Sequence, residues 1–118
     1  MKMTIEDQQA WAELCKKLGD RFNDGEPLSL EGVLFLIGVN ELGAGYRNFS
    51  KTQKMELVHI AMCRLMSLES YYKEEGRDAD GWPVWIQVQE LPSLDVEAQE
   101  QWLRNLVLRF FEIPLTES

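Results

Sequence analysis

The segment Leu30–Leu42 places the strongest limit on how this chain can fold. A helix of this length and composition would be apolar on nearly every side, so neighbouring elements have to bury it. Gly32 and Gly38 lie within it, and each is up to about 1 kcal/mol less favourable than alanine in a helix. We therefore expect a central helix that another element approaches closely. Its apolar residues are Leu30, Val33, Leu34, Phe35, Leu36, Ile37 and Val39.

Three further segments show the apolar spacing and the end signals that are typical of helices. Threonine, serine and aspartate supply the N-caps, and a capping box opens the longest of the three. We predict these helices over residues about 5–22, 51–75 and 96–111. The caps are Thr4 for the first helix, Ser50 with Gln53 for the second and Ser93 or Asp95 for the last, which Pro114 ends.

The segment Trp82–Pro92 interrupts the helical pattern. Apolar and polar residues alternate along it, and Val84, Ile86 and Val88 are β-branched, which is typical of a strand. No second strand is evident in the chain, and an isolated strand leaves its backbone polar groups unpaired. The segment therefore forms an extended arm, a single turn of helix, or a strand paired with its copy in a dimer. We predict the extended arm, over about residues 82–92.

These elements predict an all-α fold, a four-helix-bundle-like single domain over residues 1–118 with a Trp/Pro-rich arm between the third and fourth helices. With 118 residues, 45% hydrophobic and 27% charged, the chain has the composition of an ordinary globular domain. Cys15 and Cys63 lie among apolar neighbours, so we expect two reduced core thiols. No apolar run is long enough to span a bilayer and no secretory leader opens the chain, so we expect a cytoplasmic protein without membrane contact.

The net charge of −8 argues against binding to nucleic acid, which requires lysine and arginine to neutralise phosphates. Acidic residues concentrate between Glu69 and Glu100, whereas Arg47, Lys51 and Lys54 form a small basic patch. A run of charge is usually only a solvated face. An acidic end and a basic end can nevertheless pair between two subunits or with a partner protein.

Glu56 and His59 have the Glu-x-x-His spacing that places both side chains on one face of a helix. Bundles that hold two metal ions use two such motifs and two more glutamates, but this chain has a single histidine. A symmetric dimer could supply the set if Glu31, Glu41 or Glu69 added a carboxylate. Because short matches arise easily by chance, we expect no metal and no cofactor. Glu41, Glu56, His59 and Glu69 remain the candidate residues of a ligand or metal site.

Glu69 falls inside the apolar arc of the predicted third helix. A carboxylate there is paired with a cation such as Arg64 or Lys73, has a raised pKa, or turns out to solvent at the edge of the arc. No nucleophile set, nucleotide loop or calcium loop can be assembled, so no catalytic residue is predicted and an enzyme is the less favoured reading. The remaining enzyme hypothesis uses Glu69 or Glu41 as a general base in an apolar pocket.

Half of the chain, between Phe35 and Trp85, resembles a small family of uncharacterised bacterial helical proteins. The resemblance implies a self-standing bacterial domain, and it transfers no activity and no functional residue. The segments that carry it are Leu36–Gly43 (LIGVNELG), His59–Leu65 (HIAMCRL) and Asp80–Pro83 (DGWP).

Two functional hypotheses follow. The first is a small cytoplasmic protein that acts through protein–protein contact, as a homodimer or with a protein partner, because the chain has more large apolar residues than a short bundle covers easily. Its candidate interface residues are Trp82, Trp85, Arg47, Lys51 and Lys54. More simply, the two tryptophans anchor the third helix to the last. The alternative is a helical bundle with a carboxylate and histidine site for a ligand or metal.

Overall fold

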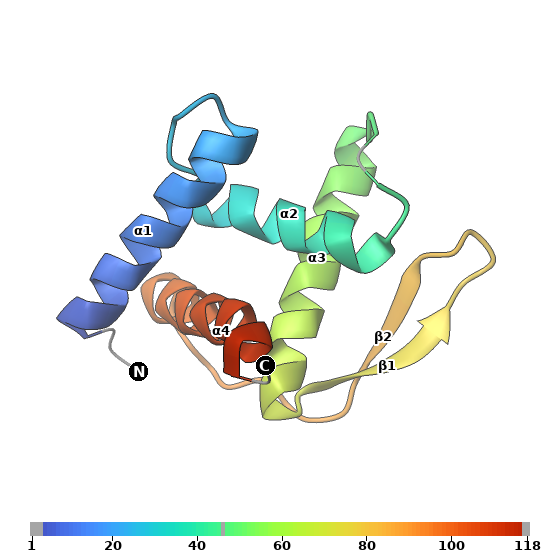
Figure 1. Cartoon of the computed structure of the whole chain (residues 1–118). Helices are drawn as coiled ribbons and strands as arrows, with labels where there is room; N and C mark the ends of the chain where they lie inside the picture. The colour runs from blue at the N-terminus through green and yellow to red at the C-terminus, as the bar shows by residue number, and fades with distance from the viewer. Residues whose placement is uncertain (1–3, 46, 117–118) are drawn as a thin grey trace. The chain divides into compact units, whose positions relative to one another are not determined.

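The computed structural model describes residues 4–45 and 47–116 of the protein. The chain divides into two compact units. Unit 1 consists of Met1–Leu30 and Pro92–Ser118, and unit 2 consists of Glu31–Leu91. Unit 1 is helical, whereas unit 2 combines helices with a small sheet (Figure 1). The single domain over residues 1–118 stays a prediction.

Unit 1 contains α1 (Ile5–Phe22) and α4 (Val96–Thr116), which contact each other. The predicted caps are present. Thr4 and Asp7 form a capping box at the start of α1, and the Asp95 carboxylate accepts a hydrogen bond from the Ala98 amide (2.8 Å) at the start of α4. The prediction that Pro114 ends the last helix is wrong, because α4 continues to Thr116. So close to a helix end, a proline removes only one backbone hydrogen bond.

Gly19 determines how the chain leaves α1. Its carbonyl accepts hydrogen bonds from the amides of Asn23 (2.8 Å) and Gly25 (3.0 Å), which fold the following loop back against the helix. A Cβ atom at position 19 would lie 2.0 Å from the Glu26 carbonyl oxygen. No side chain fits at that distance, so the loop can pack here only because residue 19 is glycine.

Unit 2 contains α2 (Leu30–Leu42), α3 (Lys51–Met66) and a short 3₁₀ helix, η1 (Ser67–Glu69). The first residue of α2, Leu30, is counted with unit 1. The predicted burial of α2 is confirmed, since Val33, Leu34, Ile37 and Leu42 are all buried. The close approach expected at Gly38 is also confirmed. A Cβ atom there would lie 2.2 Å from the Leu57 carbonyl oxygen of α3.

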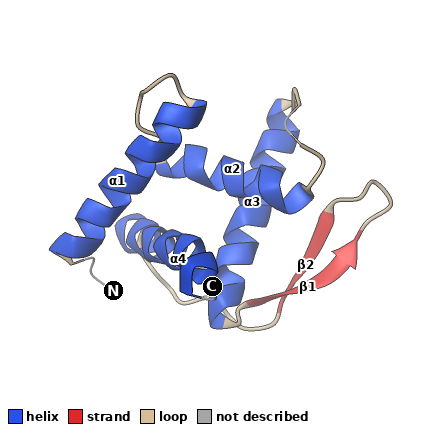
Figure 2. Cartoon of the chain, in the orientation of Figure 1, coloured by secondary structure: helices blue, strands red, loops and turns tan. Residues whose placement is uncertain are grey.

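The prediction of an all-α fold is wrong, because unit 2 also contains a two-stranded antiparallel sheet (Figure 2). Strand β1 is Tyr72–Arg77 and strand β2 is Pro83–Gln87. The expected extended arm is therefore half of a hairpin. The expected third helix stops at Met66 instead of 75, and its last residues supply the partner strand that the sequence did not reveal.

Local conformation explains why α3 does not continue into β1. Ser70 adopts a left-handed backbone conformation (φ 65°), which closes η1 and ends the helical path. Farther along, the Asp78 carboxylate organises the hairpin turn by accepting hydrogen bonds from the amides of Asp80 (2.9 Å) and Trp82 (3.0 Å). Gly81 has a positive φ of 84°, which glycine adopts in a turn at no steric cost.

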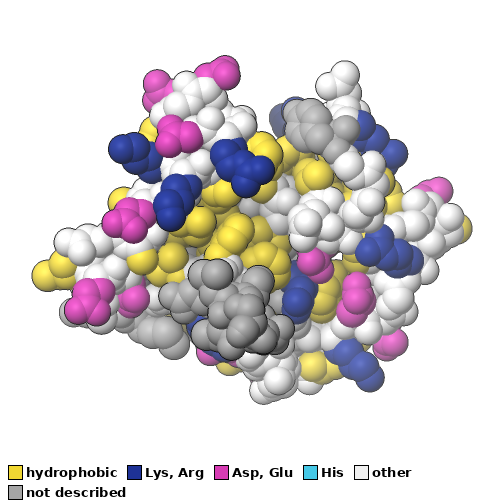
Figure 3. Space-filling model, in the orientation of Figure 1, with side chains coloured by type: hydrophobic (Ala, Val, Ile, Leu, Met, Phe, Trp, Pro, Cys, Tyr) yellow, Lys and Arg dark blue, Asp and Glu magenta, His cyan; other side chains and the backbone are white. Residues whose placement is uncertain are grey.

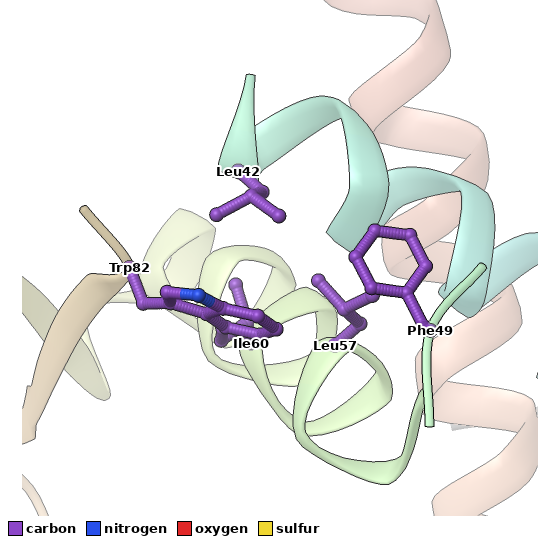
Figure 4. Packing of buried hydrophobic residues seen from close by; sticks show 5 residues of the cluster. All are labelled: Leu42, Phe49, Leu57, Ile60 and Trp82. Atoms are coloured by element: carbon purple, nitrogen blue, oxygen red, sulfur yellow. The ribbon is translucent and has the colours of Figure 1, made fainter. Parts of the chain in front are cut away.

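A hydrophobic cluster joins the hairpin to the helices of unit 2. Trp82, which is 8% exposed, lies over α3 beside Ile60, with Leu42 of α2 and Phe49 close by (Figure 4). The rings of Phe49 and Trp82 meet edge to face, with centroids 6.4 Å apart. Trp82 is therefore an internal anchor that fixes the hairpin to α2 and α3. The buried residues of the cluster are Leu42, Phe49, Leu57, Ile60 and Trp82.

Cys15 and Cys63 are free and buried, which confirms the predicted reduced core thiols. Burial raises the pKa of the Cys63 thiol to about 11, so the thiol stays protonated at neutral pH. Burial also raises the pKa of the Cys15 thiol, so neither cysteine has the thiolate character of a catalytic nucleophile. A search of the described helices found none with the length and apolarity that a bilayer span requires.

Candidate functional site

The candidate site is a polar pocket in unit 2, with a volume of about 430 Å³. One face of the hairpin supplies three of its side chains, and the ends of the neighbouring helices supply the others. We call this face of the hairpin the inner face and the opposite one the outer face. The lining residues are Glu41 of α2, Arg64 of α3, Ser67 of η1, Tyr72 and Glu74 of β1, and Trp85 of β2.

Strand register brings the hairpin residues of the pocket together. Glu74 is paired directly with Trp85, so both side chains lie on the same face of the sheet. Tyr72 is two residues before Glu74 and therefore shares that face. The inner face thus presents a carboxylate between two aromatic side chains.

Arg77 holds the hairpin against the end of α2. Its guanidinium donates hydrogen bonds of 2.8 Å each to the carbonyls of Glu41, Leu42 and Gly81. The first two carbonyls belong to the last turn of α2, which has no further helical turn to satisfy them. One side chain therefore caps a helix, closes the hairpin loop and sets the position of the pocket.

Glu41 and Arg64 form an ion pair across the pocket, with 3.4 Å between Nε and Oε1. Their side chains are 18% and 37% exposed. Burial raises the pKa of the Glu41 carboxyl above its ordinary value, and Glu74 raises it further, while Arg64 and Arg77 act in the opposite direction. The raised pKa means that the pocket does not fully compensate the negative charge of Glu41.

Two polar groups of the pocket have no partner. The Trp85 Nε1 atom is buried and makes no hydrogen bond, which is unusual for a buried indole. In the described part of the chain, no hydrogen bond or ion pair involves the Glu74 carboxylate. The pocket therefore offers the exposed carboxylate of Glu74, whereas the Trp85 N–H is closed off from solvent.

The outer face of the hairpin is apolar on β2 and charged on β1. Val84, Ile86 and Val88 are 36%, 44% and 54% exposed, and Lys73 lies directly opposite Ile86. Over residues 4–45 and 47–116 the sheet has only these two strands, so the outer edge of β2 has no strand beside it. In the space-filling view, charges of both signs and hydrophobic surface lie side by side over the hairpin (Figure 3).

The structure separates the predicted ligand residues. Glu41 lines the pocket, whereas Glu56 and His59 are exposed on α3, and none of Glu56, His59 and Glu69 is among the lining residues. The His59 Nε2 atom instead lies 3.5 Å from the Cys63 sulfur. Within the described residues, no group of three or more histidine, cysteine, aspartate or glutamate side chains could hold a metal ion.

Glu69 lies in η1 and is half-buried, so the helical wheel that placed it in an apolar arc does not apply to it. Arg64, one of its expected partners, pairs with Glu41 instead. Of the expected interface residues, Trp85 lines the pocket and the Arg47 guanidinium lies over the Phe49 ring, 5.2 Å from its centroid. Lys51 and Lys54 are exposed on the first turns of α3.

Sequence reasoning missed Tyr72, Glu74 and Arg77 as site residues. All three lie in β1, which had been assigned to a helix and its end. A usable signal was present in the Asp80-Gly81 pair, a common hairpin turn, because strands flank such a turn on both sides.

Comparisons with protein-family models, with curated proteins and with solved structures found no match to this chain. The resemblance to bacterial helical proteins stays a prediction.

Proposed function

We propose that this protein acts through protein–protein contact, and that it associates with a second copy of itself through strand β2. One observation carries the proposal: β2 contains no charged residue, and its outer face exposes β-branched side chains. Exposed apolar edge strands are templates for pairing with another chain.

The contrast between the two strands selects β2. Strand β1 has the sequence YKEEGR, with four charges in six residues, and charged side chains are a common protection of an edge against pairing. Strand β2 has the sequence PVWIQ and lacks that protection. Its proline stands at the first position, where it removes no hydrogen bond from the rest of the edge.

A two-fold axis gives this contact a definite geometry. Antiparallel pairing of two β2 strands about Trp85 would place Val84 of each chain opposite the partner's Ile86. The two hairpins would then form one four-stranded sheet. A hairpin alone is marginally stable in water, and additional strands with a shared apolar face stabilise it.

The thiols, the family resemblance and the net charge bear on where the protein acts and on its partners. Buried free thiols suit a reducing compartment, so we propose a cytoplasmic location. The family resemblance supports a bacterial domain that folds on its own. No nucleic acid or membrane partner is proposed, because the net charge of −8 opposes binding to polyanions.

The test is the mass of the protein in solution, measured by light scattering and sedimentation over a range of micromolar concentrations. We expect a species near twice 13.7 kDa that dissociates on dilution. Ile86→Glu places a carboxylate beside Val84 of the second copy and weakens association by about tenfold or more, since a charge set into an apolar contact has an effect of that order.

The hairpin itself should tolerate Ile86→Glu, because the new carboxylate lies directly opposite Lys73. Ile5→Glu is the matched control, since Ile5 is a 73% exposed isoleucine on α1 and the change in net charge is the same. A monomer at every concentration would overturn the proposal. Equal weakening by both variants would also overturn it, because the loss would then come from charge alone.

A further inference from the structure

We propose that the pocket under the inner face of the hairpin binds a small organic ammonium ion. The site lies within a single chain and is separate from the β2 edge. Its volume of about 430 Å³ is within the range of small-ligand sites, roughly 300–1,000 Å³.

The charges of the lining residues determine the sign of the ligand. The pocket contains two carboxylates, Glu41 and Glu74, and one guanidinium, that of Arg64. Arg64 is engaged by Glu41 at 3.4 Å and by the Ser67 hydroxyl at 3.3 Å. Glu74 therefore faces the pocket as an uncompensated carboxylate. A cation satisfies it, whereas an anion would meet a net negative site.

The neighbours of Glu74 favour an organic cation over a hydrated metal ion. The pocket supplies the indole of Trp85 and the phenol of Tyr72 on the same face as the carboxylate. Aromatic faces attract alkylammonium groups through cation–π interactions and bury their carbon atoms. A divalent metal ion requires several oxygen ligands, and no group of three such ligands was found in the described residues.

Choline and ethanolamine are simple organic ammonium ions with which to probe the pocket, the first quaternary and the second primary.

Calorimetric titration with choline and with ethanolamine tests the proposal. Their neutral isosteres, 3,3-dimethylbutan-1-ol and propan-1-ol, have the same shape and hydroxyl without the charge. We expect saturable binding of at least one ammonium compound and none of its isostere. The proposal is overturned if neither ammonium compound binds, or if charged and neutral compounds bind equally.

Variants locate the binding in the pocket. Glu74→Gln should weaken ammonium binding by about fivefold, the effect expected for one partly exposed charge pair. Glu75→Gln is the control, because Glu75 is the next residue of β1, is exposed like Glu74, and does not line the pocket. Equal effects of the two variants would show a general effect of net charge and would reject the pocket.

Ile86→Glu separates this site from self-association. Ile86 is on the outer face of the hairpin, so the variant should bind the ammonium compound as the original protein does while its association is weakened. Loss of ammonium binding in this variant, with the fold intact by circular dichroism, would contradict a site contained within one chain.

Discussion

At the scale of the residue, Glu41 connects the fold to the pocket. It lies in the last turn of α2, pairs with Arg64, and its backbone carbonyl accepts a hydrogen bond from Arg77. Its pKa is nevertheless raised, because burial and the nearby Glu74 outweigh the two arginines. Ionised Glu41 is therefore less favourable in the folded protein than in water.

The raised pKa of Glu41 predicts how stability depends on pH. A carboxyl group whose pKa is higher in the folded state favours folding below its unfolded pKa, near 4.5, and this contribution disappears as pH rises through the folded pKa. Glu41→Gln fixes the neutral form. Compared with the original protein, the variant should therefore gain in relative stability as pH rises from below 4.5 to neutrality.

Urea unfolding at a series of pH values measures this difference. Glu75→Gln, which removes an exposed carboxylate from the same unit, controls for the change in net charge. If Glu41→Gln instead became relatively less stable as pH rises, the ion pair with Arg64 would dominate over burial, and the direction of the pKa shift would be wrong.

At the scale of the element, the sequence predicts those features that depend on residues close together in the chain. The N-cap at Thr4 and the capping box at Ser50 were predicted and are present, because a cap depends on residues only three positions apart. Strand β1 was missed because its residues are mostly charged and its anchor is distant. Arg77 donates to the carbonyl of Leu42, which is 35 residues away in sequence.

The same difference explains which part of the site was predicted. Glu41 was a candidate from the start, whereas Glu74 and Trp85 became neighbours only through the register of the hairpin. That register depends on the turn at Asp78 and on tertiary contacts of Trp82. Strand propensity also depends strongly on context, so the charged segment of β1 gave no clear strand signal.

The prediction at the scale of the element concerns the substitution of Arg77. Arg77→Gln removes a charged donor from three carbonyls, and it should lower the free energy of unfolding by about 1–3 kcal/mol. The hairpin should open before the helices of unit 2 do. Hydrogen exchange of the β1 and β2 amides measures this opening, and chemical denaturation measures the loss of stability.

Arg77→Lys should rescue little of this loss, because a lysine ammonium lacks the planar fork that contacts several acceptors at once. Lys73→Gln is the control on the same strand, since Lys73 is exposed on the outer face. Full rescue by lysine would mean that Arg77 acts through its charge and not through the geometry of its hydrogen bonds.

At the scale of the whole molecule, the net charge of −8 opposes every contact between two copies. An interface can overcome this repulsion in two ways. In the proposed dimer the contact is made by strand β2, which carries no charge and so adds nothing to the repulsion. Alternatively, the basic patch of Arg47, Lys51 and Lys54 could pair with acidic residues of another copy, as the charge pattern first indicated.

Ionic strength distinguishes these two interfaces. Between about 0.1 M and about 1 M salt the Debye length falls from about 10 Å to about 3 Å, so repulsion between the copies and attraction between exposed ion pairs are both screened. Association through β2 should become tighter with added salt, because only repulsion is lost and apolar contact remains. Association through the basic patch should weaken, because its attraction is lost. Sedimentation equilibrium of the original protein and of Ile86→Glu at both salt concentrations measures the outcome. If salt weakened the association of the original protein, the interface would lie on the charged surfaces and not on β2.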